Sequence, residues 1–166
     1  AVCSFCDTDF YGTDGINGGK YMAKELIEKI KSLWISADNQ IRVVLTGGEP
    51  LLQVDKPLID ALKNEDIYIA VETNGTLEAP DGIDWICMSP KANTEIKLKK
   101  GSEVKVVYPQ KNLNPDDFNV LDFKNFYIQP MDSQSYEDNV SQAVKYCMRN
   151  PNWKLSLQTH KILGIR

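Results

Sequence analysis

The chain has 166 residues, of which 42% are hydrophobic and 25% are charged, as is usual for a globular domain that buries a core. Its net charge of −4 argues against a nucleic-acid-binding surface, which is normally basic. No apolar run approaches the roughly 20 residues that cross a bilayer, and no signal-peptide pattern is apparent. We therefore expect a cytoplasmic protein with neither a membrane nor a nucleic acid as its direct partner.

Six short apolar segments recur along the chain, and each runs into polar or glycine-rich residues. Near-continuous β-branched runs of this kind are typical of strands buried on both faces of a parallel sheet. The expected strands with their polar ends cover residues 41–50, 67–75, 83–91, 103–109, 126–132 and 153–161.

Three helical patterns lie between or before these strands. The first covers 19–34, with an apolar stripe at Leu26, Ile27, Ile30, Leu33 and Trp34. The second starts at Asp55, just before Pro57, with an inward face of Leu58, Ile59 and Leu62. The third is expected to be capped by Ser135, with a stripe of Val140, Ala143, Val144, Cys147 and Met148.

The connections between the strands from residue 67 to residue 126 are too short or irregular to hold a helix after each strand. The pattern therefore predicts an α/β fold: a trimmed, incomplete (β/α) barrel with about six mainly parallel strands and about three helices, in one domain over residues 1–166. Ligands of such folds bind at the carboxyl ends of the strands.

Polar motifs stand at those predicted strand ends. In TGGEP, Gly47 and Gly48 allow a ligand to approach the backbone closely, and Glu49 offers an acceptor for a group such as an ammonium. A simple turn before the next helix explains the same motif about equally well. In ETNG, Glu72 is a candidate ligand contact, whereas Asn74 and Gly75 are expected to form a structural turn.

Two further strand ends repeat this arrangement, in SPK (89–91) and QPMD (129–132), where a proline holds polar groups in place. His160 is the single histidine and follows the last predicted strand, so a structural role and a functional one are equally plausible. The lysines at 91, 97, 99, 100 and 105 are expected to line a solvated loop face, with Lys91 excepted because of its SPK context.

A CxxC pair, Cys3 and Cys6, lies near the start of the chain. A zinc site usually needs two such pairs, and a thioredoxin-like dithiol would open a helix rather than the loop sequence that follows here. Iron–sulfur ligation remains possible, although the sequence supplies only part of the thiolates. Cys87 and Cys147 fall within a strand and on a helix stripe, so we expect both to be core residues.

CxxC followed by GGEP at a strand end resembles the radical S-adenosylmethionine superfamily. Seven ordered blocks narrow the resemblance to the 7-carboxy-7-deazaguanine synthase family of queuosine (7-deazapurine) biosynthesis. They are VCSFCDTDFYGTDGINGGK, VVLTGGEPLLQ, IAVETNGTL, IDWICMSPKA, EVKVVYPQ, YIQPMD and LSLQTHK, and together they span nearly the whole chain.

The resemblance implies a 4Fe–4S cluster held by three cysteines, with the fourth iron left for S-adenosylmethionine. Cys3 and Cys6 match the second and third ligands. The first would lie upstream of Ala1, so we expect that the natural protein has an N-terminal strand and cysteine absent from this chain, and that this chain alone does not hold a normal cluster.

The same resemblance implies the reaction and the rest of the site. A 5′-deoxyadenosyl radical would abstract hydrogen from C6 of 6-carboxy-5,6,7,8-tetrahydropterin, and ring contraction with loss of ammonia would give 7-carboxy-7-deazaguanine. Thr8 would bind Mg²⁺. Matches to substrate contacts are Thr46, Glu72 and His160. The family's C-terminal main-chain carboxylate also contacts the substrate, and by position it would be that of Arg166 if this residue is the natural end. Matches to cofactor contacts are Phe5, Asp7, Gly47, Gly48, Glu49, Ser89, Pro90, Lys91, Gln129, Pro130, Met131 and Asp132.

A homodimer and a flavodoxin-like reductant are further expectations from the family. No protein side chain is expected to act as the radical itself. Two other functions stay open at this point: a non-catalytic module that binds S-adenosylmethionine or a metal, and a zinc- or thiol-based structural domain.

Overall fold

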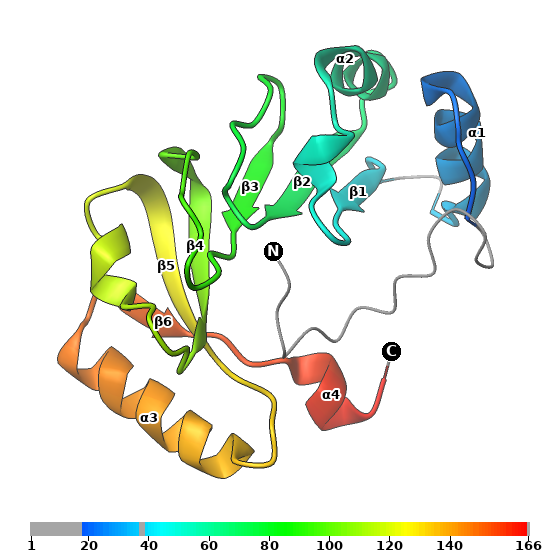
Figure 1. Cartoon of the computed structure of the whole chain (residues 1–166). Coiled ribbons are helices and arrows are strands. Elements are labelled where there is room, and N and C mark those ends of the chain that lie inside the picture. The colour runs from blue at the N-terminus through cyan, green and yellow to red at the C-terminus, as the bar shows by residue number, and fades with distance from the viewer. Residues whose placement is uncertain (1–17, 37–38, 166) are drawn as a thin grey trace.

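The computed structural model describes residues 18–36 and 39–165, and its centre is one six-stranded sheet. The strands are β1 (Arg42–Leu45), β2 (Tyr68–Thr73), β3 (Trp85–Met88), β4 (Lys100–Tyr108), β5 (Asp122–Pro130) and β6 (Trp153–Leu155). They lie in the order β1-β2-β3-β4-β5-β6, and every neighbouring pair is parallel. Because β1 and β6 do not pair, this part of the chain forms an open barrel (Figure 1).

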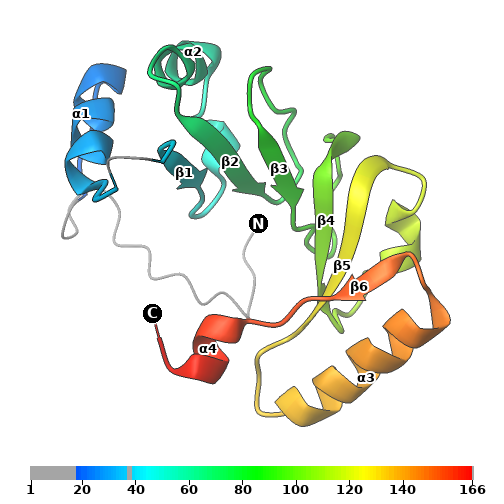
Figure 2. The same ribbon diagram turned by 180° about the vertical axis from the view of Figure 1, so that it is seen from behind.

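In the described residues, four α-helices and two 3₁₀ turns precede, connect or follow the strands. The helices are α1 (Ala23–Leu33), α2 (Lys56–Asn64), α3 (Tyr136–Arg149) and α4 (Thr159–Leu163), and the 3₁₀ turns are η2 (Pro50–Leu52) and η3 (Pro115–Phe118). Figure 2 shows α1 and α2 beside β1 and β2, with α3 at the other end of the sheet. Between β2 and β5 there is no α-helix, so the prediction of an incomplete barrel whose middle strands are joined without helices is confirmed. Within the described ranges, no helix has the length and apolar character needed to span a membrane.

The second predicted helix is confirmed in detail. Asp55 occupies the N-cap of α2 and its carboxylate accepts the backbone N–H of Leu58 at 3.0 Å, while Pro57 stands in the first turn. Ile59 and Leu62 are fully buried and pack with Ile27 of α1 and Ile69 of β2. This cluster fixes α1 and α2 against one end of the sheet.

The third helix begins directly after Ser135, as predicted, but part of its predicted stripe was wrong. Ala143 is fully buried and Cys147 packs against the core, whereas Val144 is 37% exposed and Met148 is 78% exposed. Ser135 occupies the N-cap position without a capping bond from its side chain. The inward face is completed by Tyr146, which packs on the cluster around Trp153 and so turns Met148 outward.

Two other boundaries differ from the expectation. The helix predicted over 19–34 covers only Ala23–Leu33, and Leu33 from its stripe is 71% exposed. The segment 153–161 was expected to hold the last strand and its polar end, and the strand part is short: β6 covers only Trp153–Leu155, which pair with Phe126–Ile128 of β5. Beyond it the chain leaves the sheet and forms α4.

The strands are not buried on both faces, contrary to the sequence prediction. Side chains alternate along β4, where Val104 and Val106 are fully buried, whereas Lys105 between them faces the other side and contacts Glu72 of β2. The outer face packs on the helices and loops. The inner face carries charged and polar groups, so only one face of the sheet needs an apolar cover.

A carboxylate joins α2, β2 and the start of β3 on the outer side. Asp84 accepts the backbone N–H of Ile69 at 2.8 Å and binds Lys63 Nζ at 2.8 and 2.9 Å. Burial acts to raise the pKa of Asp84, but the hydrogen bonds from Lys63 and Ile69 and the charge of Lys63 outweigh it, so the pKa is lowered.

Because its pKa is lower in the folded state, Asp84 stabilises the fold above its unfolded pKa of about 3.9, and this contribution is lost as pH falls through the folded value. We expect Asp84→Asn to lower the free energy of unfolding at pH 7 by about 1–2 kcal/mol and to cost less near pH 2. Urea unfolding across this pH range measures the difference, with the exposed Asp81→Asn as control. A cost that does not change with pH would contradict this assignment.

Candidate active site

The parallel strands bring most of the predicted polar motifs to one edge of the sheet, where the strands end. Backbone hydrogen bonds join neighbouring strand ends there: Ser89 N–H donates to Thr73 C=O at 2.7 Å, and Met131 N–H donates to Tyr108 C=O at 2.7 Å. TGGEP follows β1, ETNG closes β2, SPK follows β3 and QPMD closes β5. The expectation that these four motifs share an edge is thus fulfilled.

Glu49 of TGGEP ties the ends of β1 and β2 together. Its Oε1 accepts Thr73 Oγ1–H at 2.7 Å and Leu51 N–H at 3.0 Å, and its Oε2 accepts Asn74 N–H at 2.7 Å. Both carboxylate oxygens therefore stabilise the loop itself. The sequence identified Glu49 as a potential ligand acceptor, and the structure adds this scaffold role.

The two glycines before Glu49 leave their backbone uncovered. Gly47 has φ of +127°, a conformation that favours glycine, and a Cβ placed at either Gly47 or Gly48 would meet no heavy atom within 4 Å. Space is therefore open directly above the peptide groups, as a ligand that binds to the backbone requires. Thr46, also predicted to contact a ligand, follows β1 immediately and is exposed.

ETNG forms the structural turn that was predicted. Asn74 Oδ1 accepts the backbone N–H of Thr76 at 2.9 Å and its hydroxyl at 2.7 Å, and Gly75 has φ of +80°. Asn74 is 7% exposed. It therefore shapes the end of β2 rather than facing a ligand.

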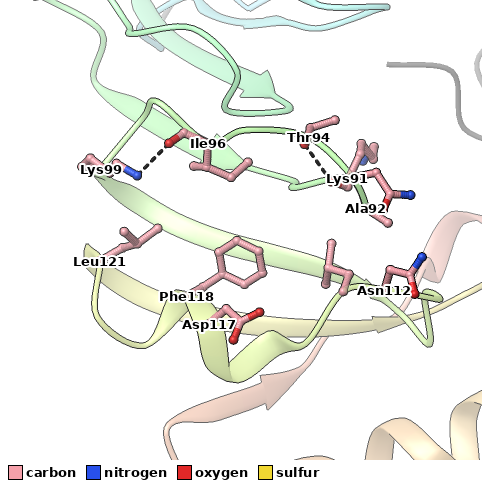
Figure 3. A pocket seen from close by; sticks show the side chains of 11 residues that line it. Lys91, Ala92, Thr94, Ile96, Lys99, Asn112, Asp117, Phe118 and Leu121 are labelled. Atoms are coloured by element: carbon pink, nitrogen blue, oxygen red, sulfur yellow. Dashed lines mark hydrogen bonds between the residues drawn. The ribbon is translucent and has the colours of Figure 1, made fainter.

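SPK after β3 holds its lysine by local bonds. Lys91 Nζ donates to the Ser89 backbone C=O at 3.0 Å and to Ser89 Oγ at 2.8 Å, and Pro90 is fully buried beneath them. Lys91 also borders a hollow of about 260 Å³ between the loop after β3 and the loop after β4 (Figure 3). The bonds drawn there, Thr94 Oγ1 to Lys91 C=O and Lys99 Nζ to Ile96 C=O, both lie within the first loop, so they stabilise the loop's own shape.

QPMD connects the sheet edge to the last helix. Asp132 Oδ2 binds Lys161 Nζ at 2.7 Å, which ties the end of β5 to α4. Met131 C=O accepts Asn139 Nδ2–H at 2.8 Å, which holds the same segment to α3. His160 lies on α4 next to Lys161 and is exposed.

Glu72 lies on the inner face of β2, where its Oε1 binds Lys105 Nζ of β4 at 2.9 Å. The Lys105 side chain is only 21% exposed, so the expectation that it belongs to a solvated loop face was wrong. Sequence reasoning also missed its contact with Glu72. The alternation of side chains in EVKVVY could have shown which face Lys105 occupies, because it places Lys105 on the other face of the sheet from the buried Val104 and Val106.

Cys87 of β3 lies between these two charged side chains. It is 2% exposed, as predicted for a core residue. Burial raises the pKa of the Cys87 thiol strongly, Lys105 opposes this, and the carboxylates of Glu103 and Glu72 add to the increase. The thiol is therefore neutral and not a nucleophile at physiological pH.

Part of the predicted site lies outside the described residues, so the structure does not place it: Cys3, Phe5, Cys6, Asp7, Thr8 and Arg166. Within residues 18–36 and 39–165, no three side chains of the His, Cys, Asp and Glu types are grouped closely enough to hold a metal ion. The described edge carries glycine backbone together with hydroxyl, carboxylate and ammonium groups.

No protein-family model matches the chain, but whole-chain relatives are clear. It is 54% identical over 167 residues to 7-carboxy-7-deazaguanine synthase of Bradyrhizobium diazoefficiens, covering 100% of this chain and 80% of the relative. It is 52% identical over 166 residues to the protein of that name from Burkholderia multivorans, covering 99% and 79%. The crystal structure of QueE from Escherichia coli matches with a TM-score of 0.63 at 24% identity, over 84% of this chain and 65% of that one.

The open parallel sheet with its polar carboxyl edge defines an α/β protein of the incomplete-barrel class, and the QueE crystal structure shares this fold. The sequence identities fix the relationship more narrowly. The chain belongs to the 7-carboxy-7-deazaguanine synthase family.

The scaffold role of Glu49 can be tested by Glu49→Gln. The substitution places an amide NH₂ against backbone or hydroxyl donors, so we expect the free energy of unfolding to fall by about 1–3 kcal/mol. Chemical denaturation measures it. Glu78→Gln, an exposed residue in the loop between β2 and β3, is the matched control and should change stability by less than about 0.5 kcal/mol. Equal stability of the two variants would show that the Glu49 bonds contribute nothing net.

Proposed function

We propose that the protein converts 6-carboxy-5,6,7,8-tetrahydropterin to 7-carboxy-7-deazaguanine and ammonia by a radical S-adenosylmethionine mechanism. The observation that carries this proposal is the 54% identity to a synthase of that name over the whole chain. The described site is compatible with it, because the polar motifs named from the sequence lie at the carboxyl edge of a parallel sheet. We also propose that residues 1–166 belong to a single domain.

S-adenosylmethionine is proposed to bind along the strand ends. The open backbone at Gly47 and Gly48 fits its amino-acid portion, and the segments 89–91 and 129–132 would contact the remainder. Cys3 and Cys6 are proposed as two of the 4Fe–4S ligands, Phe5 and Asp7 as cofactor contacts and Thr8 as a ligand of Mg²⁺, a cation that prefers oxygen. When bound, the cluster and S-adenosylmethionine would supply the radical that abstracts hydrogen at C6.

The pterin is proposed to bind on the inner face of the sheet. Its guanidine-like edge presents adjacent N–H donors, and a carboxylate is the natural acceptor for such an edge. Glu72 fits this role because its side chain is 44% exposed and, among the described residues, only its Oε1 has a hydrogen-bond partner. Thr46, His160 and the chain-terminal Arg166 are proposed as further substrate contacts.

The protein is also proposed to form a homodimer and to receive electrons from a flavodoxin-like reductant, as expected for the family. The competing function is a module that binds S-adenosylmethionine or a metal without turnover. Iron and sulfide analysis of the intact, anaerobically reconstituted protein, together with a turnover assay, separates the two: four irons with product support the enzyme, and a full cluster without product supports the module.

The substrate role of Glu72 gives a specific prediction. Glu72→Gln puts an amide N–H against the donor edge of the pterin, so we expect kcat/KM to fall about 100-fold, equivalent to ~2.7 kcal/mol, at unchanged iron content. Product formation followed by mass spectrometry measures it, with Glu78→Gln as control. An unaltered kcat/KM in Glu72→Gln would exclude this carboxylate from substrate binding.

A further inference from the structure

We propose that Lys105 is a positioning residue for substrate binding: it holds the Glu72 carboxylate so that Oε2, which has no hydrogen-bond partner among the described residues, faces the pterin. This inference rests on the proposed function and adds to it a residue of β4 that the sequence motifs did not include. Its basis is a contact between side chains of two strands that are not neighbours in the sheet.

The contact spans the intervening strand β3. Glu72 is in register with Cys87, and Cys87 is in register with Glu103, so Lys105 stands two residues beyond the position opposite Cys87. Its side chain reaches back across β3 to place Nζ 2.9 Å from Glu72 Oε1. This diagonal approach passes over the side chain of the intervening strand, so a small side chain there leaves room for it.

Cys87 supplies that small side chain. It is 2% exposed and its thiol is close to the charges of Glu72, Glu103 and Lys105. A longer residue at position 87 would occupy the space over which the lysine extends. The neutral thiol therefore serves as a spacer beneath the ion pair.

The charged side chains nearest Cys87 are those of Glu72, Glu103 and Lys105. They sum to −1 within this cluster, while Arg42 of β1 and Lys154 of β6 add positive charge to the same face of the sheet. Burial acts to lower the pKa of Lys105, but the hydrogen bond and charge of Glu72 and the charge of Glu103 act in the opposite direction, and the pKa is raised, so the lysine is charged. Lys105 restrains Glu72 without neutralising the whole group.

A fixed Glu72 should favour binding because the cost of ordering its side chain is already met in the free protein. Glu72 Oε1 binds the lysine. The Glu72 side chain is 44% exposed, so its Oε2 can accept a hydrogen bond from a ligand. Without Lys105 the Glu72 side chain would rotate freely, and each binding event would have to order it.

The test compares Lys105→Met and Lys105→Arg with the wild type in the intact, reconstituted protein. The methionine side chain is nearly as long as that of lysine but carries no charge. A residue that positions Glu72 stabilises the bound substrate and the transition state equally. We therefore expect Lys105→Met to raise KM for the pterin about tenfold, with kcat changed less than about threefold. Lys105→Arg should recover most of the affinity because it keeps the charge.

A double-mutant cycle shows whether the effect passes through Glu72. In a Glu72→Gln background, adding Lys105→Met should lower kcat/KM by much less than the tenfold expected in the wild type. An equal loss in both backgrounds would contradict the assignment, because Lys105 would then act independently of Glu72.

Lys63→Met is the matched control, since it removes an ion pair of similar length, Lys63–Asp84, on the outer side of the sheet. It should leave KM unchanged. If Lys105 were merely structural, Lys105→Met would lower the thermal midpoint and the active fraction, so that kcat would fall while KM stayed the same. Wild-type turnover with an unchanged KM in Lys105→Met overturns this inference alone, whereas a wild type that binds its cluster but makes no product overturns the proposed function and this inference with it.

Discussion

Parallel pairing of all six strands is the constraint on which the rest of the structure depends. It brings every strand end to one edge, so short motifs separated by tens of residues become neighbours. Glu49 illustrates the consequence, because its carboxylate can bond Thr73 and Asn74 only when β1 and β2 run in the same direction and end together. The binding edge and its internal supports therefore have a common origin.

The two faces of this open sheet serve different purposes. The outer face is apolar and packs on α1 and α2 at one end and on α3 at the other, with Ile59, Leu62, Val104 and Val106 fully buried. The inner face is charged, and Glu72 and Lys105 meet across β3 there. Stability thus comes mainly from one side of the sheet, which leaves the other free to carry polar groups for a ligand.

The sequence predicted the fold class, the six strands and the shared edge, because β-branched runs and turn residues report local structure directly. It did not predict that one face of the sheet carries charged and polar side chains, since the runs are apolar enough to suggest apolar burial on both faces. It also missed the Glu72–Lys105 pair. That contact depends on the register of three strands, which is not encoded within a short window of sequence.

The most direct test of the central claim, that the strand ends form one ligand-binding edge, is hydrogen–deuterium exchange of the intact reconstituted protein with and without S-adenosylmethionine and the pterin. The account predicts that both ligands together slow exchange in peptides covering 46–49, 72–76, 89–92 and 129–132. Protection confined to the opposite edge, at the turns around residues 66 and 84, would contradict it.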